Sequence, residues 1–286
     1  MGVTSPGPDN ESIKKTSEFW QIYNMESYTY PDKQDKMIVQ FIKEKDENYW
    51  IESENIILDL IKSYFENLLP KKKRNFLDAG CGSGRLIPYF ASCFNEIDGF
   101  EPDEERFKEA KEFIKLNNLE DKTRLFQGSL QEYQIAFNKN ADFILCSHVI
   151  QHIHSYSVEA FLTALSGLLN KNGLLAITTN HSIRPSNYFM KSYLKNGLTT
   201  SEEINEEEFN LFISGEGILP VQFFNYNILA EFLNSIGLEV IDFKVFHIDD
   251  SDRTLLKTKN YDAYFNASKV RQKKYGRDMM ILVRKK

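Results

Sequence analysis

Three glycines alternate along one short stretch of the chain, and an acid precedes them: Asp78, Gly80, Gly82 and Gly84. Glycine allows positive φ angles and lets a ligand approach the backbone without a Cβ in the way. The amides of such a turn, with the start of a following helix, favour polar or negatively charged ligand groups. A dinucleotide fingerprint, G-x-G-x-x-G, would need its third glycine where Arg85 stands. The stretch, with Cys81 inside it, therefore predicts a ligand-binding loop of another type.

A second acid, Glu101, follows the next predicted strand, 23 residues after Asp78. At that spacing, a carboxylate can reach the two hydroxyls of a bound ribose. Its oxygens have enough lone pairs to accept both hydroxyl protons. Pro102 follows directly, and the turn Gly128–Leu130 comes after the third predicted strand. We therefore expect a ribose-bearing ligand at these strand ends.

Histidines gather after the fourth predicted strand, where His148, His152 and His154 stand close together. A zinc-protease helix reads H-E-x-x-H, but Val149 occupies the position of the glutamate, so we predict no metal site. His181 follows the fifth predicted strand. For His152 the alternatives are a general base and a structural or ligand-side contact, and for His181 a base and a loop residue.

These residues stand at the ends of strands that alternate with helices from Asn75 onwards. We expect strands over residues 75–79, 96–100, 123–127, 141–146, 174–179, 239–247 and 278–284. Helices are expected over residues 84–93, 103–117, 155–169 and 225–236, and residues 11–69 are mostly helical in pattern. Such alternation implies a parallel sheet with helices on both faces, which binds ligands at the carboxyl ends of its strands.

Residues 181–222 interrupt this alternation and show no clean period. An interruption of that length in a compact α/β unit predicts a functional insertion such as a lid, the alternative being a surface excursion without a role.

The composition sets further limits. The chain has 286 residues, a formal net charge of −6 and 42% hydrophobic residues, as is ordinary for a globular protein. The negative net charge disfavours non-specific electrostatic binding of nucleic acid. Three cysteines without paired spacing predict no disulfide framework and favour the cytoplasm. No apolar run is long enough to predict a membrane span.

Taken in order, the segments 76–85, 101, 128–130, 146–153 and 169–178 resemble the class I S-adenosylmethionine-dependent methyltransferases. The resemblance implies a Rossmann-like α/β fold: a seven-stranded, mostly parallel sheet whose last strand is antiparallel. It implies a methyltransferase domain over residues 71–286, with an insertion after the fifth strand at about 181–222. Residues 1–70 then form a helical N-terminal extension or lid.

The same resemblance implies S-adenosylmethionine as cofactor and S-adenosylhomocysteine as product. The glycine loop would hold the methionine end, Glu101 the ribose, and the turn after the third strand the adenine. Ser129 stands where members commonly carry Asp, so the Ser129 hydroxyl and the Leu130 amide are the expected adenine contacts. The implied cofactor residues are Asp78, Gly80, Cys81, Gly82, Gly84, Glu101, Pro102, Gly128, Ser129, Leu130, Ser147, His148 and Gln151.

For the reaction, we expect O- or N-methylation of a small organic metabolite or a peptide, with a carboxylate among the candidate acceptors, by direct in-line displacement. His152 and His181 are the candidate bases, and the aromatic residues expected to meet the substrate are Trp20, Tyr23, Tyr28, Tyr188 and Phe223. The segment after the fourth strand lacks the Pro-Pro-Tyr pattern of nucleic-acid base methyltransferases, so nucleic acid is disfavoured as a partner.

Two other functions stay open. A tRNA-modifying methyltransferase would use the basic connection at residues 253–277. A cofactor-binding regulatory module would bind without turnover. A monomer and a homodimer are both compatible with the sequence.

Overall fold

The structure, a computed structural model, describes residues 47–69, 74–137, 139–196, 198–211, 218–246, 262–266 and 278–286. Within these residues, ten strands form one sheet. Its centre is parallel, with the spatial order β3-β2-β1-β4-β5. The bounds of these strands are β1 Asn75–Ala79, β2 Glu96–Glu101, β3 Thr123–Gln127, β4 Ala141–Ser147 and β5 Leu169–Ser182.

Two antiparallel strands complete the predicted core beyond β5. β10 (Asp278–Lys285) pairs with β5, and β9 (Leu238–Phe246) pairs with β10. The expected Rossmann-like sheet with its antiparallel last strand is confirmed, and each of the seven predicted strands is present. β1 is buried from Phe76 to Ala79, as a central parallel strand must be when helices cover both faces.

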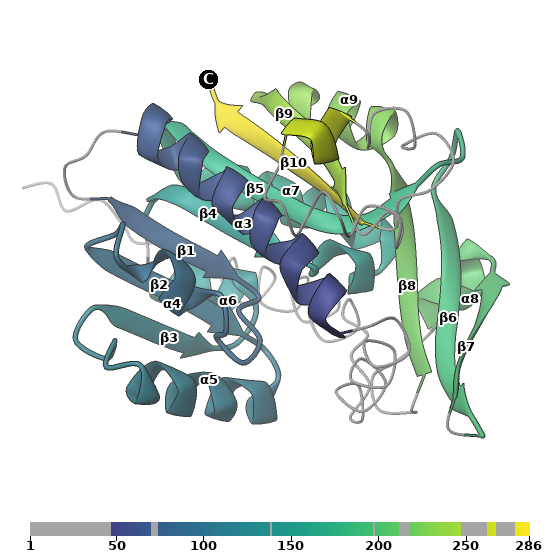
Figure 1. Cartoon of the computed structure of the whole chain (residues 1–286), viewed down its shortest axis with the longest axis horizontal. Helices are drawn as coiled ribbons and strands as arrows, with labels where there is room; N and C mark the ends of the chain where they lie inside the picture. The colour runs from purple at the N-terminus through teal and green to yellow at the C-terminus, as the bar shows by residue number, and fades with distance from the viewer. Residues whose placement is uncertain are drawn as a thin grey trace, which may run out of the picture.

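Helices cover the two faces of this sheet in separate sets (Figure 1). On one face lie α3 (Glu47–Leu68), α4 (Ile87–Ala91) and α5 (Glu104–Leu116). On the other lie α6 (Leu130–Ala136), α7 (Val158–Leu168) and α9 (Tyr226–Ser235). α3 crosses the sheet and buries Phe65 completely in the first core, where the ring lies 5.3 Å from that of Phe143. The division of the chain at residue 70 stays a prediction.

An additional layer arises from the segment expected to be an insertion: β6 (Tyr188–Lys195), β7 (Leu198–Ile204), α8 (Glu206–Leu211) and β8 (Ile218–Asn225). β6 pairs antiparallel with both β7 and β8, and β8 joins β5 at the His181–Phe224 register. Charged cross-strand partners such as Lys191 and Glu202 mask the period of these strands in the sequence. In Figure 1 the strands β1 and β3 point toward the side on which this layer stands.

Some boundaries differ from those expected. α6 was not predicted; it begins with a capping box in which Ser129 and Glu132 satisfy each other's backbone groups. α4 begins later than residue 84 because Gly84 has a φ of +76°, outside the helical region. β5 begins at Leu169 rather than 174, with a register shift opposite Ala141–Phe143.

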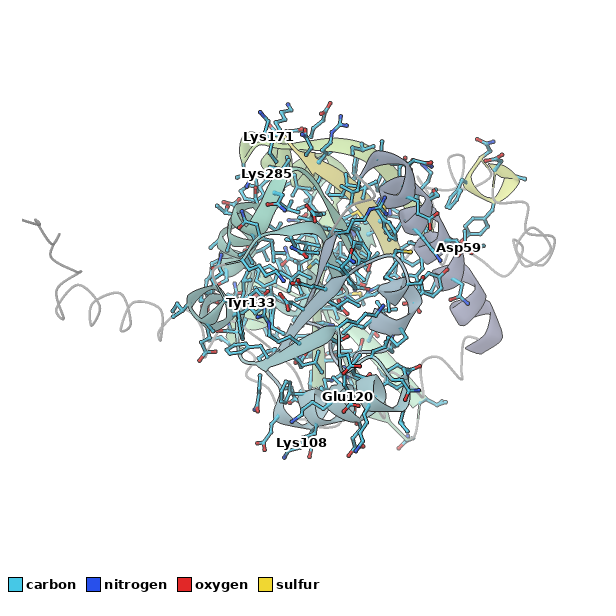
Figure 2. All side chains as sticks on the ribbon, turned by 90° about the vertical axis from the view of Figure 1, so that its left-hand side faces the viewer. Asp59, Lys108, Glu120, Tyr133, Lys171 and Lys285 are labelled. Carbon is cyan, nitrogen blue, oxygen red and sulfur yellow. The ribbon has the colours of Figure 1, made fainter. Side chains whose placement is uncertain are left out.

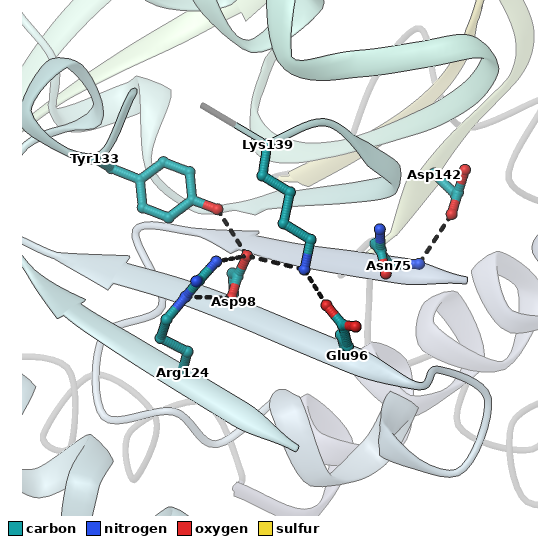
Figure 3. A network of polar contacts seen from close by, with 7 residues as sticks. All are labelled: Asn75, Glu96, Asp98, Arg124, Tyr133, Lys139 and Asp142. Carbon is teal, nitrogen blue, oxygen red and sulfur yellow. Dashed lines mark hydrogen bonds and ion pairs between the residues drawn. The ribbon is translucent and has the colours of Figure 1, made fainter. Parts of the chain in front are cut away.

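A buried carboxylate ties the edge of the sheet together on the α6 face (Figure 3). Asp98 on β2 accepts from Arg124 Nε at 3.0 Å and Nη2 at 2.7 Å, and from the Tyr133 hydroxyl at 2.9 Å. Lys139 Nζ lies 3.9 Å from the same carboxylate. Other charged side chains, such as Lys108 on α5, lie at the periphery of the molecule (Figure 2).

Candidate active site

The glycine loop leaves β1 with three residues in the left-handed region. Gly80, Gly82 and Gly84 have φ angles of +72°, +55° and +76°. A Cβ added at Gly80 would lie 2.7 Å from Val149 Cγ2, so glycine is required there both by conformation and by space. Cys81 is buried, and its backbone N–H donates to the Phe100 carbonyl at 2.9 Å. The loop is thus fastened to β2 and packs against the segment that follows β4.

Glu101 ends β2 directly beside this loop. It is 2% exposed, and its two oxygens accept from the backbone N–H groups of Gly82 and Asp103, each at 2.9 Å. Burial raises the pKa of Glu101, while these two amides oppose the rise. The amides fix the carboxylate at the end of the strand, and its oxygens retain further lone pairs for ligand hydroxyls. Pro102, the next residue, is exposed.

Asp78, at the end of β1, is an acid buried without a full set of partners. It is 2% exposed, and its Oδ2 has no hydrogen-bond partner in the described part of the chain. Burial raises the pKa of Asp78 to about 7; Arg85 opposes the rise and Glu101 adds to it. A buried carboxylate with an unpartnered oxygen is costly in the free protein, and a bound cationic or N–H donor group would offset that cost.

The end of β3 continues the same edge. Gly128, with a φ of +151°, donates its N–H to the Glu101 carbonyl at 3.0 Å. The Ser129 hydroxyl is engaged at the start of α6, where it donates to Glu132 Oε2 at 2.8 Å. Leu130 is 2% exposed. The structure therefore brings this turn next to Glu101, and the adenine contacts assigned to Ser129 and Leu130 stay a prediction.

The end of β4 is joined to β5 by side chains. The Ser147 hydroxyl lies 2.9 Å from that of Thr178, its register partner on β5. Gln151 Oε1 accepts from the Thr179 hydroxyl at 3.0 Å, and Gln151 Nε2 lies 3.1 Å from His148 Nδ1. His148 has a φ of +56°, which is uncommon for a residue other than glycine. Ser147, His148 and Gln151 thus form one hydrogen-bonded group with β5.

The two candidate bases lie in different surroundings. His152 is 5% exposed in a short 3₁₀ turn, and its Nδ1 lies 3.1 Å from the Pro220 carbonyl of β8. His181 is 7% exposed on β5, and its ring centroid lies 5.9 Å from that of Phe243. Since side chains alternate along a strand, His181 shares the face of Thr179 and lies opposite to Thr178 and Asn180.

Of the five predicted substrate aromatics, two lie among the described residues. Tyr188 on β6 and Phe223 on β8 are register partners, and their rings stack at 4.5 Å with an interplanar angle of 9°. The Arg184 guanidinium lies 4.2 Å from the Tyr188 ring. Trp20, Tyr23 and Tyr28 lie outside the described residues, as does most of the basic connection 253–277.

The polar end of β5 carries site residues that the sequence reasoning missed. Thr178 and Thr179 hold the segment after β4, and Asn180 is 1% exposed with an Oδ1 that has no partner among the described residues. The signal was present as a run of polar residues directly after a fully apolar stretch. Pro220, which contacts His152, gives no such signal because its proline side chain has no part in the contact.

These features fit S-adenosylmethionine. Gly80 leaves the space that a Cβ would fill, Asp78 offers an unpartnered buried oxygen, and Glu101 is held beside the loop. A sulfonium and an ammonium group suit a buried acid, and ribose hydroxyls suit a fixed carboxylate.

Comparisons with known proteins agree. A family model described as a methyltransferase domain matches residues 49–242. The chain belongs to the class I S-adenosylmethionine-dependent methyltransferases, and S-adenosylmethionine is its cofactor. A comparison with curated protein sequences gives no match.

Solved structures share the fold. An S-adenosylmethionine-dependent methyltransferase from Clostridium acetobutylicum is 14% identical with a TM-score of 0.54, over 95% of this chain and 99% of that one. The 1,6-didemethyltoxoflavin-N1-methyltransferase of Burkholderia thailandensis is 14% identical with a TM-score of 0.53, over 99% and 93%. The glycopeptide N-methyltransferase MtfA is 10% identical with a TM-score of 0.53, over 80% and 90%.

Two negative observations hold for the described residues. No helix among them is both long enough and apolar enough to cross a membrane. No three or more His, Cys, Asp or Glu side chains gather among them in a way that could hold a metal ion.

Proposed function

We propose that this chain methylates an oxygen or nitrogen of a small organic or peptide acceptor, and that His152 removes the acceptor's proton. The observation that carries the proposal is the 3.1 Å contact between His152 Nδ1 and the Pro220 carbonyl. A carbonyl oxygen only accepts, so Nδ1 carries the proton and donates it. In the neutral ring, Nε2 then holds the lone pair, as a general base requires.

The residues divide into a donor side and an acceptor side. On the donor side, Asp78, the glycine loop and Glu101 would hold the cofactor, which supplies an electrophilic methyl group when bound. On the acceptor side, β8 carries both Pro220 and Phe223, the latter stacked on Tyr188. His152 stands between the two sides, because it belongs to the segment after β4 and bonds to β8. This placement supports proton removal beside the cofactor.

Several observations support a small or peptide acceptor. The stacked pair Tyr188–Phe223, with Arg184 over the Tyr188 ring, supplies aromatic and cationic groups that suit contact with an organic acceptor. Two proteins with the same fold act, by their names, on 1,6-didemethyltoxoflavin and on a glycopeptide. His181 is the other candidate for the base, and its ring lies near Phe243. We further propose a cytoplasmic enzyme in which residues 1–70 complete the acceptor side.

The test uses methyl-labelled S-adenosylmethionine with three separate pools: a metabolite fraction of a cell extract, a peptide fraction and total tRNA. We expect label in the metabolite or peptide pool. Label in tRNA alone would favour the tRNA-modifying alternative. Cofactor binding measured by calorimetry, without label in any pool, would favour the regulatory module.

His152→Gln tests the base directly. It should leave the affinity for S-adenosylhomocysteine within a few-fold and slow methyl transfer by about 10²- to 10⁴-fold, the usual contribution of a positioned base. His154→Gln is the matched control, since His154 is equally buried but bonds to the Tyr156 hydroxyl at 2.7 Å. Equal rates for the two variants would show that His152 is not the base.

A further inference from the structure

Two buried side chains and the half-buried ring of His148 form a line from β5 to the segment after β4. The Thr179 hydroxyl donates to Gln151 Oε1 at 3.0 Å, and Gln151 Nε2 lies 3.1 Å from His148 Nδ1. Thr179 is 0% and Gln151 5% exposed, so neither side chain can exchange its partners freely with water. We call Thr179, Gln151 and His148 the β5 relay.

The relay determines where the proton sits on His148. Because the Gln151 carbonyl oxygen takes the Thr179 proton, the Gln151 amide nitrogen faces the ring. An amide nitrogen only donates, so His148 Nδ1 must accept. The neutral ring therefore carries its proton on Nε2. A proton on Nδ1 would bring two N–H groups face to face, which disfavours the imidazolium form.

The backbone of His148 is held by the same strand. Its φ of +56° is costly for a residue with a Cβ, about 1 kcal/mol or more, and persists only where neighbours fix it. The His148 N–H donates to the Thr178 carbonyl at 2.8 Å. β5 thus fixes both the main chain and the ring orientation of His148, next to Ser147 at the end of β4.

We infer that Thr179 and Gln151 are positioning residues that keep His148 as a neutral Nε2–H donor toward an oxygen or nitrogen lone pair of the acceptor. This inference rests on the proposed function for its chemical meaning. His148 and His152 then hold opposite tautomers: His152 accepts the acceptor's proton, and His148 orients the acceptor through a hydrogen bond. A neutral donor also adds no positive charge beside a cationic methyl donor. The acceptor class is accordingly one with a hydrogen-bond-accepting oxygen or nitrogen close to the methylated atom.

The tautomers can be observed directly. In the full chain labelled with ¹⁵N-histidine, long-range ¹H–¹⁵N correlation spectra separate Nε2–H from Nδ1–H rings. The sequence has only five histidines, and His148→Gln and His152→Gln assign the two signals. We expect Nε2–H for His148 and Nδ1–H for His152. An Nδ1–H pattern for His148 in the wild-type chain would overturn the inference.

Two variants test the relay. Gln151→Glu replaces the amide by a carboxylate that can only accept, so His148 should gain a proton on Nδ1. Thr179→Val keeps the shape but removes the hydroxyl donor; the Gln151 amide can then turn over, and the His148 signal should become mixed. Thr179→Ser restores the donor and should restore the wild-type spectrum. The His152 signal serves as the internal check that each variant is folded.

Activity provides the second measurement. Gln151→Glu and Thr179→Val should slow label transfer about tenfold or more, as misplacement of an orienting group does. The affinity of Thr179→Val for S-adenosylhomocysteine should stay within about threefold of wild type, and Thr179→Ser should recover the rate. If Thr179→Val and Thr179→Ser give the same spectrum, the relay does not set the tautomer. If no pool accepts label, the proposed function fails, but the spectra still decide the tautomer.

Discussion

Replacement of Asp78 by Asn should make the protein more stable at neutral pH while weakening its hold on the cofactor. Asp78 is buried, its Oδ2 has no hydrogen-bond partner among the residues that the structure describes, and burial raises its pKa from 3.8 to about 7. A carboxyl group whose pKa is raised on folding contributes stability that is fully present below its unfolded pKa. That stability is lost as the pH rises through the folded pKa. An amide has no charge to bury, so Asp78→Asn escapes this loss.

The size follows from the pKa shift. The difference between about 7 and 3.8 corresponds to about 4 kcal/mol at full ionisation, at about 1.4 kcal/mol per unit. The free energy of unfolding of Asp78→Asn should therefore exceed that of wild type by up to about 4 kcal/mol at pH 8 and about 2 kcal/mol at pH 5. Other titrating groups are common to both proteins and largely cancel in the difference.

Asp98→Asn is the matched control with the opposite sign. Asp98 stands beside Leu77 on the neighbouring strand, and its carboxylate binds Arg124 and Tyr133 (Figure 3). Removal of its charge leaves these donors with a weaker acceptor. Since the Arg124 side chain is 44% exposed, we expect a loss of only about 2 kcal/mol.

Urea denaturation followed by circular dichroism between pH 5 and pH 8 gives both free energies, and calorimetry with S-adenosylhomocysteine gives the affinity. The reasoning fails if Asp78→Asn is less stable than wild type at pH 8. It also fails if the stability difference between the two proteins is the same at both pH values. Unchanged cofactor affinity in Asp78→Asn would remove Asp78 from the cofactor site without touching the stability argument.

Two further predictions concern the backbone around the site. Gly80→Ala should lower the free energy of unfolding by about 2 kcal/mol, because its φ is +72° and the new Cβ would lie 2.7 Å from Val149. Gly167→Ala, in α7 with nothing within 4 Å, should raise it by about 0.5–1 kcal/mol; urea denaturation of both variants checks the opposite signs. Ser129→Ala should cost about 1 kcal/mol through loss of the α6 cap. Glu132→Ala, at the same cap, should lower the free energy of unfolding by a similar amount. If neither variant changes that free energy, the cap does not stabilise α6.

The geometry of the proposed cofactor side was predictable because its signals are local. Gly80, Gly82 and Gly84 adopt positive φ angles that other residues avoid, so the residue type itself indicates the backbone conformation. Glu101 reaches Gly82 across only 19 residues of chain, within one strand–helix–strand unit. The strand ends follow from hydrophobic runs, and parallel pairing places those ends at one edge.

The proposed acceptor side was not predictable in the same way, because its contacts join residues far apart in the sequence. His152 and Pro220 are separated by 68 residues, and Gln151 and Thr179 by 28. The layer β6–β8 carries charged pairs such as Lys191–Glu202 on its strands, which removes the simple alternation that marks a half-buried strand. α6 was not predicted because its seven residues are too few to show a helical period.

The long-range contact of His152 has a consequence for how the proposed cofactor and acceptor sides would work together. His152 comes from the segment that follows β4, yet its tautomer is set by Pro220 on β8, the strand that also presents Phe223. Among the described residues, β8 pairs with β5 only at Phe224 and Asn225, so few strand contacts hold its Pro220 region to the central sheet. In the proposed reaction, an acceptor that shifts β8 on binding must also shift the ring that takes its proton. Acceptor recognition and proton removal are then coupled through one hydrogen bond, while the cofactor side, fixed by Gly82 and Glu101, stays in place.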